Sequence, residues 1–94
     1  MLVLPAELTH DQATASLRML LQGLASQQGA VLVDATALAR FDSSALAVLL
    51  QCRREALSRG RGFSVRGLPE RLRSLAALYG VAQLLPAESG APAA

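Results

Sequence analysis

Short apolar segments alternate three times with longer segments of helical periodicity along the 94-residue chain. The predicted strands are residues 2–4, Val31–Asp34 and Phe63–Arg66, and a helix is expected after each of them. Val31–Asp34 is apolar over most of its length, which is typical of a strand covered on both faces. A repeated strand–helix order favours right-handed crossovers between parallel strands. The sequence therefore predicts an α/β fold: a small, mostly parallel sheet packed against helices.

Residues that favour helix ends bound the first predicted helix. Thr9 and Gln12 have the spacing of a capping box at its start, and Gly29 is expected to end it. Its apolar residues recur at helical intervals and should form one stripe facing the core: Ala13, Leu17, Leu20, Leu21 and Leu24.

The second and third helices have similar boundary signals. The second should follow the loop at residues 35–41, begin at Asp42 or Ser43, and end near Gly60. Pro69 suits the first turn of the third helix, and Gly80 should close it. The apolar stripe of the third helix is expected to contain Leu68, Leu72, Leu75, Ala76 and Tyr79.

The size and charge of the chain restrict its organisation and its partners. Residues 1–86 are expected to form a single domain, and residues 87–94 a disordered tail. A formal net charge of +2 and an aromatic content of 3% are too low to indicate nucleic acid binding. No apolar run reaches the roughly 20 residues that span a bilayer, so no direct membrane insertion is expected. With one cysteine and no secretion signal at the N-terminus, the chain is expected to be cytoplasmic.

Few residues could support catalysis, and they do not form a known catalytic pattern. His10 is the only histidine, and Ser43 and Ser44 lack the Gly-x-Ser-x-Gly context of an exposed nucleophile. Cys52 falls within an apolar helix, and one His with one Cys cannot form a common zinc site. The sequence contains no phosphate-binding glycine-rich motif. We therefore expect a non-enzymatic protein with no catalytic residue, no metal and no cofactor.

The start of the second helix carries the strongest functional signal. Asp42, Ser43 and Ser44 can cap a helix, but a cap does not explain residues 45–50, which are apolar around the whole circumference. One face of a sheet can cover only one apolar stripe. The apolar surface that the sheet cannot cover predicts either a partner-binding surface or close packing by a neighbouring helix, and the sequence leaves both interpretations open.

The same region resembles the central signature of STAS domains, the fold of sulfate transporters and anti-sigma-factor antagonists. The matching segments are VD at residues 33–34, RFDS at 40–43, ALAVLL at 45–50, VRGL at 65–68 and LAALYGV at 75–81. The resemblance runs from about residue 2 to residue 86. Within the family, the sequence is most similar to the small stand-alone STAS subunits of Mla-type phospholipid ABC transporters (MlaB-like proteins).

This resemblance implies a cytoplasmic regulatory subunit that binds the ATPase of an Mla-like transporter and is peripheral to the inner membrane through that partner. The implied partner-binding residues are Asp42, Ser43, Ser44, Leu46 and Ala47. Ser43 corresponds to the functional hydroxyl of the transporter subunits. In the alternative, an anti-sigma-factor antagonist, the partner is an anti-sigma kinase and Ser44 corresponds to the phosphorylated serine.

Two positions depart from the family pattern. Ala45 stands where the family usually has glycine, which puts a very close backbone approach at that turn in doubt. The N-terminal hairpin is shortened, because the chain starts at the strand that precedes Pro5. An exposed strand edge is expected as a consequence, and with it a route to self-association.

Overall fold

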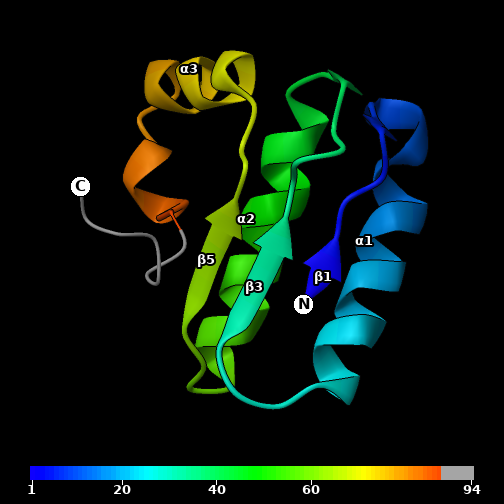
Figure 1. The fold of residues 1–94 in the computed structure, drawn as a ribbon, viewed down its shortest axis with the longest axis vertical. Coiled ribbons are helices and arrows are strands. Elements are labelled where there is room, and N and C mark those ends of the chain that lie inside the picture. The colour runs from blue at the N-terminus through cyan, green and yellow to red at the C-terminus, as the bar shows by residue number, and fades with distance from the viewer. Residues whose placement is uncertain (88–94) are drawn as a thin grey trace.

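Three parallel strands form the main sheet of the computed structural model, which describes residues 1–87. They are β1 (Leu2–Val3), β3 (Val31–Asp34) and β5 (Phe63–Arg66), in the spatial order β1-β3-β5. Val33 in the central strand lies opposite Leu2 on one side and Val65 on the other. The predicted α/β class and the three predicted strands are therefore confirmed (Figure 1).

A second pair of strands was not predicted. Two residues after Pro5, β2 (Glu7–Leu8) runs parallel to β4 (Arg40–Phe41), which lies in the segment expected to be a loop. The carbonyl oxygen of Ala6 accepts hydrogen bonds from the backbone N–H groups of Ala39 and Arg40 at 2.8 and 2.9 Å. Each of these short strands leads into a helix, so their pairing brings the starts of two helices together.

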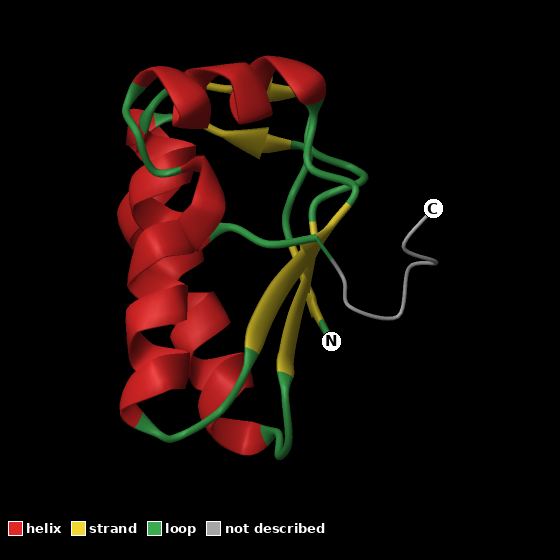
Figure 2. Cartoon of the chain, turned by 90° about the vertical axis from the view of Figure 1, so that its left-hand side faces the viewer, coloured by secondary structure: helices red, strands yellow, loops and turns green. Residues whose placement is uncertain are grey.

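The helices are α1 (His10–Ser26), α2 (Ser44–Ser58) and α3 (Glu70–Leu78), followed by the short 3-10 helix η1 (Ala82–Leu84). Both long helices, α1 and α2, lie on the same face of the main sheet, and α3 crosses near one end of the molecule (Figure 2). Within residues 1–87, no helix combines the length and the hydropathy needed to cross a membrane.

Coverage by helices on one face corrects the expectation that Val31–Asp34 is covered on both. Val31 and Val33 point to the helices and are buried, whereas Leu32 and Asp34 point to the other face and are only half-buried. A run of only four residues is too short to distinguish a strand covered on one face from a strand covered on both. The number of covered faces depends on where the helices pack, which the run itself does not encode.

The core lies between this sheet and the two long helices. Leucines from four different elements have almost no exposed surface, including Leu8, Leu24, Leu49 and Leu72. The predicted stripe of α1 is confirmed, since Leu20 and Leu24 are buried and the other three residues are half-buried. Burial of aliphatic side chains stabilises such a fold by about 25 cal/mol for each Å² of apolar surface removed from water.

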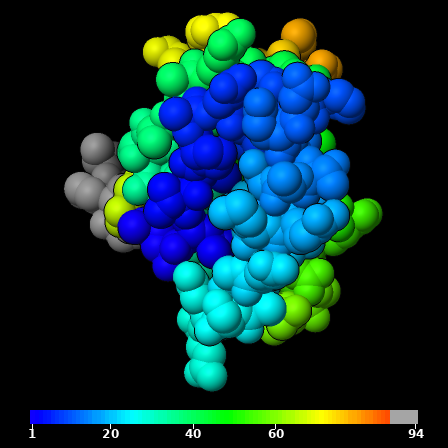
Figure 3. Space-filling view, turned by 90° about the vertical axis from the view of Figure 1, so that its right-hand side faces the viewer, coloured from blue at the N-terminus to red at the C-terminus, as the bar shows by residue number. Residues whose placement is uncertain are grey.

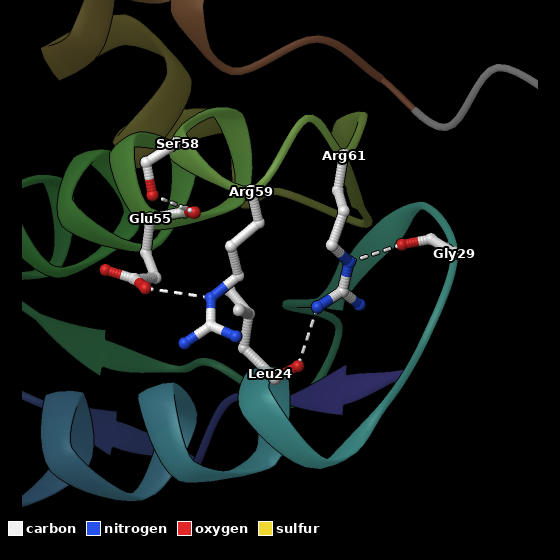
Figure 4. A network of polar contacts seen from close by, with 6 residues as sticks. All are labelled: Leu24, Gly29, Glu55, Ser58, Arg59 and Arg61. Atoms are coloured by element: carbon white, nitrogen blue, oxygen red, sulfur yellow. Dashed lines mark hydrogen bonds and ion pairs between the residues drawn. The ribbon is translucent and has the colours of Figure 1, made fainter.

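The two ends of α1 are held by side chains. At its start the Gln12 side-chain oxygen accepts the backbone N–H of Thr9 at 2.8 Å, as a capping box requires. At its end the guanidinium of Arg61 donates to the carbonyl oxygens of Leu24 and Gly29 (Figure 4). The helix stops at Ser26, so the prediction that Gly29 caps it is wrong; Gly29, with φ 83°, forms the turn before β3.

The third helix follows its predicted bounds but not all of its predicted packing. Leu72 and Ala76 are buried, and Gly80, with φ 74°, closes the helix as expected. Tyr79 is 58% exposed, because it lies past the last helical residue and turns away from the core.

The C-terminal segment returns to the main sheet after η1. The backbone N–H of Val65 donates to the carbonyl oxygen of Pro86 at 2.8 Å, and Ala87 forms an isolated parallel bridge with Val65. Ala87 was assigned by the sequence to the tail. The rest of the predicted tail, residues 88–94, lies outside the described residues.

A close approach after β5 makes Gly67 sensitive to substitution. Gly67 has φ 67°, and a β-carbon added there would collide with the side chain of Thr36. Thr36 has little room to move, because its backbone N–H and its hydroxyl both donate to Oδ1 of Asp34, at 2.9 and 2.6 Å. Gly80 has a similar φ of 74°, but no atom lies within 4 Å of its added β-carbon.

We predict that Gly67→Ala destabilises the domain more than Gly80→Ala does. Gly80→Ala should cost about 1–2 kcal/mol, the strain of a left-handed backbone. Gly67→Ala adds overpacking of about 1–3 kcal/mol and should cost about 2–5 kcal/mol altogether. Urea unfolding of both variants measures the difference. Equal losses of stability would show that Thr36 moves aside freely.

Candidate partner-binding site at the start of α2

The first turns of α1 and α2 lie next to each other. β2 ends at Leu8, two residues before α1 begins, and β4 ends at Phe41, three residues before α2 begins. Because β2 and β4 are paired, the two helices start from neighbouring points and then run along the same face of the sheet (Figure 1). We call Asp42, Ser43 and Ser44, which lie between β4 and the first turn of α2, the serine corner.

The Asp42 carboxylate joins the starts of both helices. Its Oδ1 accepts the backbone N–H of Ser44 at 2.8 Å, and its Oδ2 accepts the backbone N–H of His10 at 3.0 Å. Both donors are first-turn N–H groups that have no partner within their own helix. The negative charge also lies at the positive ends of two helix dipoles. Asp42 is therefore the capping group, and Ser43, although it occupies the N-cap position, makes no side-chain capping bond.

Hydrogen bonding sets the protonation of the two aspartates at this end of the sheet. The backbone N–H of His10 and then that of Ser44 lower the pKa of Asp42 below its ordinary value. The pKa of Asp34 is lowered too, chiefly by the hydroxyl and then the backbone N–H of Thr36. Each carboxylate is thus held in its charged form by its own set of donors.

The structure divides the five predicted binding residues into accessible and buried ones. Asp42, Ser43 and Ala47 are exposed, and Ser44 is half-buried. Leu46, by contrast, is only 3% exposed and belongs to the core of the described chain, so its side chain does not reach the exposed surface of α2. On α2, Leu46 and Ala47 lie about 100° apart, which is enough to place one inside and the other outside.

The surplus apolar surface of α2 is explained by packing against α1. Ala45, Leu46, Val48 and Leu49 are all buried, and α1 packs along α2. From the side of α1, that helix and the N-terminal segment occupy most of the visible face, and the green of α2 shows at its margin (Figure 3). Of the two interpretations left open by the sequence, the burial of these four residues favours close packing by a neighbouring helix, together with the sheet.

A hollow of about 320 Å³ separates the exposed edges of the two helices beside the serine corner. We call it the α1–α2 hollow; its lining includes His10, Thr14 and Leu17 from α1 and Ser44, Ala47 and Gln51 from α2. The α1 residues were not predicted as part of a site. The sequence gives little sign of their role. Thr14 and Leu17 lie near the border between the apolar and polar faces of α1, and this border marks a binding site only once the position of α2 is known.

The remaining reactive side chains are placed for structural roles. Cys52 is fully buried in α2, and its burial raises the thiol pKa to about 11, which keeps the thiol protonated at neutral pH. Within residues 1–87, no three His, Cys, Asp or Glu side chains gather in a group that could hold a metal ion.

A parallel three-stranded sheet, two helices on one face and a serine corner at their common start define a small α/β domain of the STAS type. A family model described as "Mlab, STAS domain" matches residues 1–86, and the chain therefore belongs to this family. The resemblance found in the sequence is confirmed over its whole extent. STAS domains are generally non-catalytic regulatory domains. A search among curated proteins gives no match.

The shared carboxylate predicts an acid-sensitive fold. Asp42 has a lowered pKa in the folded state, so its stabilising effect is complete above the unfolded value of 3.8 and is lost as the pH falls through the folded value. Asp42→Asn should lower the melting temperature at pH 7 and make stability fall less steeply below about pH 4. Asp34 should account for part of the decline that remains.

Thermal melts between about pH 2 and 7 test this expectation. Asp11→Asn is the matched control, because it removes a carboxylate from the first turn of α1 and leaves the bonds to Ser44 and His10 intact. A variant Asp42→Asn that unfolds with the acid dependence of the unmodified protein would contradict a coupling role for Asp42.

Proposed function

We propose that this chain is a non-enzymatic subunit that binds and regulates the ATPase of an ABC-type, Mla-like phospholipid transport system. The observation that carries the proposal is an exposed serine corner, bordered by Ala47 and the α1–α2 hollow, in a member of the MlaB STAS family. In this role the chain acts in the cytoplasm and is held at the inner membrane through the ATPase.

The geometry of the corner suits a protein surface. Ser43, Ser44 and Ala47 are small, so the backbone of a partner can approach α2 closely at its first turns. Asp42 holds the two helix starts in fixed positions, and a rigid surface loses little conformational entropy when it binds. The α1–α2 hollow provides a concave neighbour in which a side chain of the ATPase would insert.

The second candidate function is an anti-sigma-factor antagonist that binds an anti-sigma kinase and is switched by phosphorylation of Ser44. Ser44 is half-buried, and its hydroxyl contributes to the hydrogen bonding that lowers the pKa of Asp42. Ser43 is exposed and makes no capping bond, so its hydroxyl is free to meet a partner. This difference in accessibility favours the transporter role, in which Ser43 is the functional hydroxyl.

Adjacent residues of α2 allow folding and binding to be separated. Ala47→Arg places a charged side chain on the exposed surface and should change stability by less than about 0.5 kcal/mol. It should weaken binding to the ATPase of the Mla-type transporter from the same genome at least tenfold, about 1.4 kcal/mol. Co-purification and calorimetric titration with that ATPase measure the effect.

Leu46→Arg is the matched comparison, because the same side chain then enters the core. An unpaired buried charge costs several kcal/mol, so this variant should melt roughly 15 °C or more below the unmodified protein. Normal ATPase binding by a folded Ala47→Arg variant would exclude the start of α2 as the interface.

Single substitutions at the serine corner distinguish the two candidate functions. Both serines lie at a helix N-terminus, where an added negative charge is tolerated by the fold. At an apolar interface the same charge must lose its hydration, which weakens the contact. We expect Ser43→Asp to reduce ATPase binding at least tenfold, about 1.4 kcal/mol. Binding of an anti-sigma kinase that is abolished by Ser44→Asp, with no ATPase binding by the unmodified chain, would support the antagonist instead.

A further inference from the structure

A second hollow, of about 410 Å³, lies on the opposite side of Ala47 from the α1–α2 hollow. We call it the α2–η1 hollow, because it is formed by the exposed edge of α2 and by Leu84 of η1. Leu50, Leu57 and Leu84 contribute apolar side chains to it, and Leu57 is 48% exposed. Ala47 and Gln51 line both hollows, so the two are continuous across one ridge of α2.

Two cations border the α2–η1 hollow. Arg53 is half-buried and Arg54 is exposed, and neither takes part in a hydrogen bond or ion pair within residues 1–87. The acidic residue next to them in the sequence, Glu55, is bonded to Arg59 instead, at 2.8 Å (Figure 4). The hollow therefore combines an apolar lining with two guanidinium groups that no carboxylate of the described chain neutralises.

This combination selects the chemistry of an occupant. An apolar side chain would fill the hollow, and carboxylates beside it would pair with the two guanidinium groups, which bind carboxylates with well-defined geometry. A nucleic acid is disfavoured, because the net charge of the chain is only +2 and a polyanion needs many cationic contacts. A flat lipid surface is disfavoured, because two of the three leucines, Leu50 and Leu84, are half-buried in the lining of the hollow.

We propose that the α2–η1 hollow docks a protruding apolar side chain of the partner ATPase, flanked on the ATPase by acidic residues. The inference rests on the proposed function and extends the binding surface from the serine corner to the C-terminal half of α2. Continuity of the two hollows across Ala47 and Gln51 joins both regions into one surface. Charges at the border of an interface act mainly on the rate of association and on its salt dependence.

The test compares two charge reversals of equal size. Arg53→Glu/Arg54→Glu changes the border of the hollow, and Arg18→Glu/Arg73→Glu makes the same change at exposed positions of α1 and α3 outside it. Binding kinetics with the purified ATPase of the Mla-type transporter from the same genome are measured between about 50 and 500 mM NaCl. The first variant should associate at least tenfold more slowly and lose most of the salt dependence. The control should stay within about threefold of the unmodified chain.

The outcomes separate this inference from the proposed function. Equal binding by the two double variants would overturn the inference while leaving ATPase binding by the corner intact. Failure of the unmodified chain to bind the ATPase would overturn both. Binding to anionic phospholipid vesicles that is lost in Arg53→Glu/Arg54→Glu, with ATPase binding unchanged, would assign the hollow to a membrane surface and also overturn it. If the double variant melts at a lower temperature than the unmodified protein, the single variant Arg54→Gln, at an exposed position, replaces it. Its association rate should fall by a smaller factor, about threefold.

Discussion

The carboxylate of Asp42 joins the starts of the two long helices, and the arrangement of the candidate site depends on this junction. It accepts the backbone N–H of Ser44, two positions along the chain, and that of His10, 32 positions away. These two donors lie at the starts of different helices, which the pairing of β2 with β4 brings together. With both helix starts joined at one point, α1 and α2 begin side by side, and the burial of their apolar residues keeps them packed together on one face of the sheet. In this arrangement α1 packs on α2, Leu46 is buried and Ala47 stays exposed.

Local sequence patterns were sufficient for the three strands of the main sheet and for the three α-helices, but not for the short strands or for the mutual arrangement of the elements. The run at Val31–Asp34 and the alternation at Phe63–Arg66 are visible within four residues each, and the structure confirms both strands. Strands of two residues, such as β2 and β4, are too short to show any periodicity. Their pairing depends on segments that are more than 30 residues apart, and a pattern within one segment does not report such contacts.

The candidate site shows the same difference between local features, which the sequence predicts, and contacts between distant segments, which it does not. The sequence predicted a helix cap at Asp42 or Ser43, because polar residues before an apolar helical run are a local signal. The bond of Asp42 to His10 joins distant segments and was not predicted. The five predicted binding residues all lie at the start of α2, yet burial removes Leu46 from the surface. Which side of an apolar helix faces outward is decided by the neighbouring helix. The sequence could therefore locate the site along the chain, but not its orientation.

The exposed side chains of α2 are small near the serine corner and long and charged farther along the helix. Under the proposed function, the two ends of the helix therefore have different roles in binding. Near the corner it carries Ser43, Ser44 and Ala47, which lose little side-chain entropy when a partner covers them. Farther along it carries Arg53 and Arg54, whose long side chains lose more entropy on ordering but attract a partner over about 8 Å at physiological salt. Close contact at the corner then controls how long the complex lasts, and the arginines control how fast it forms. One helix would thus set both rates through residues that lie outside the buried core.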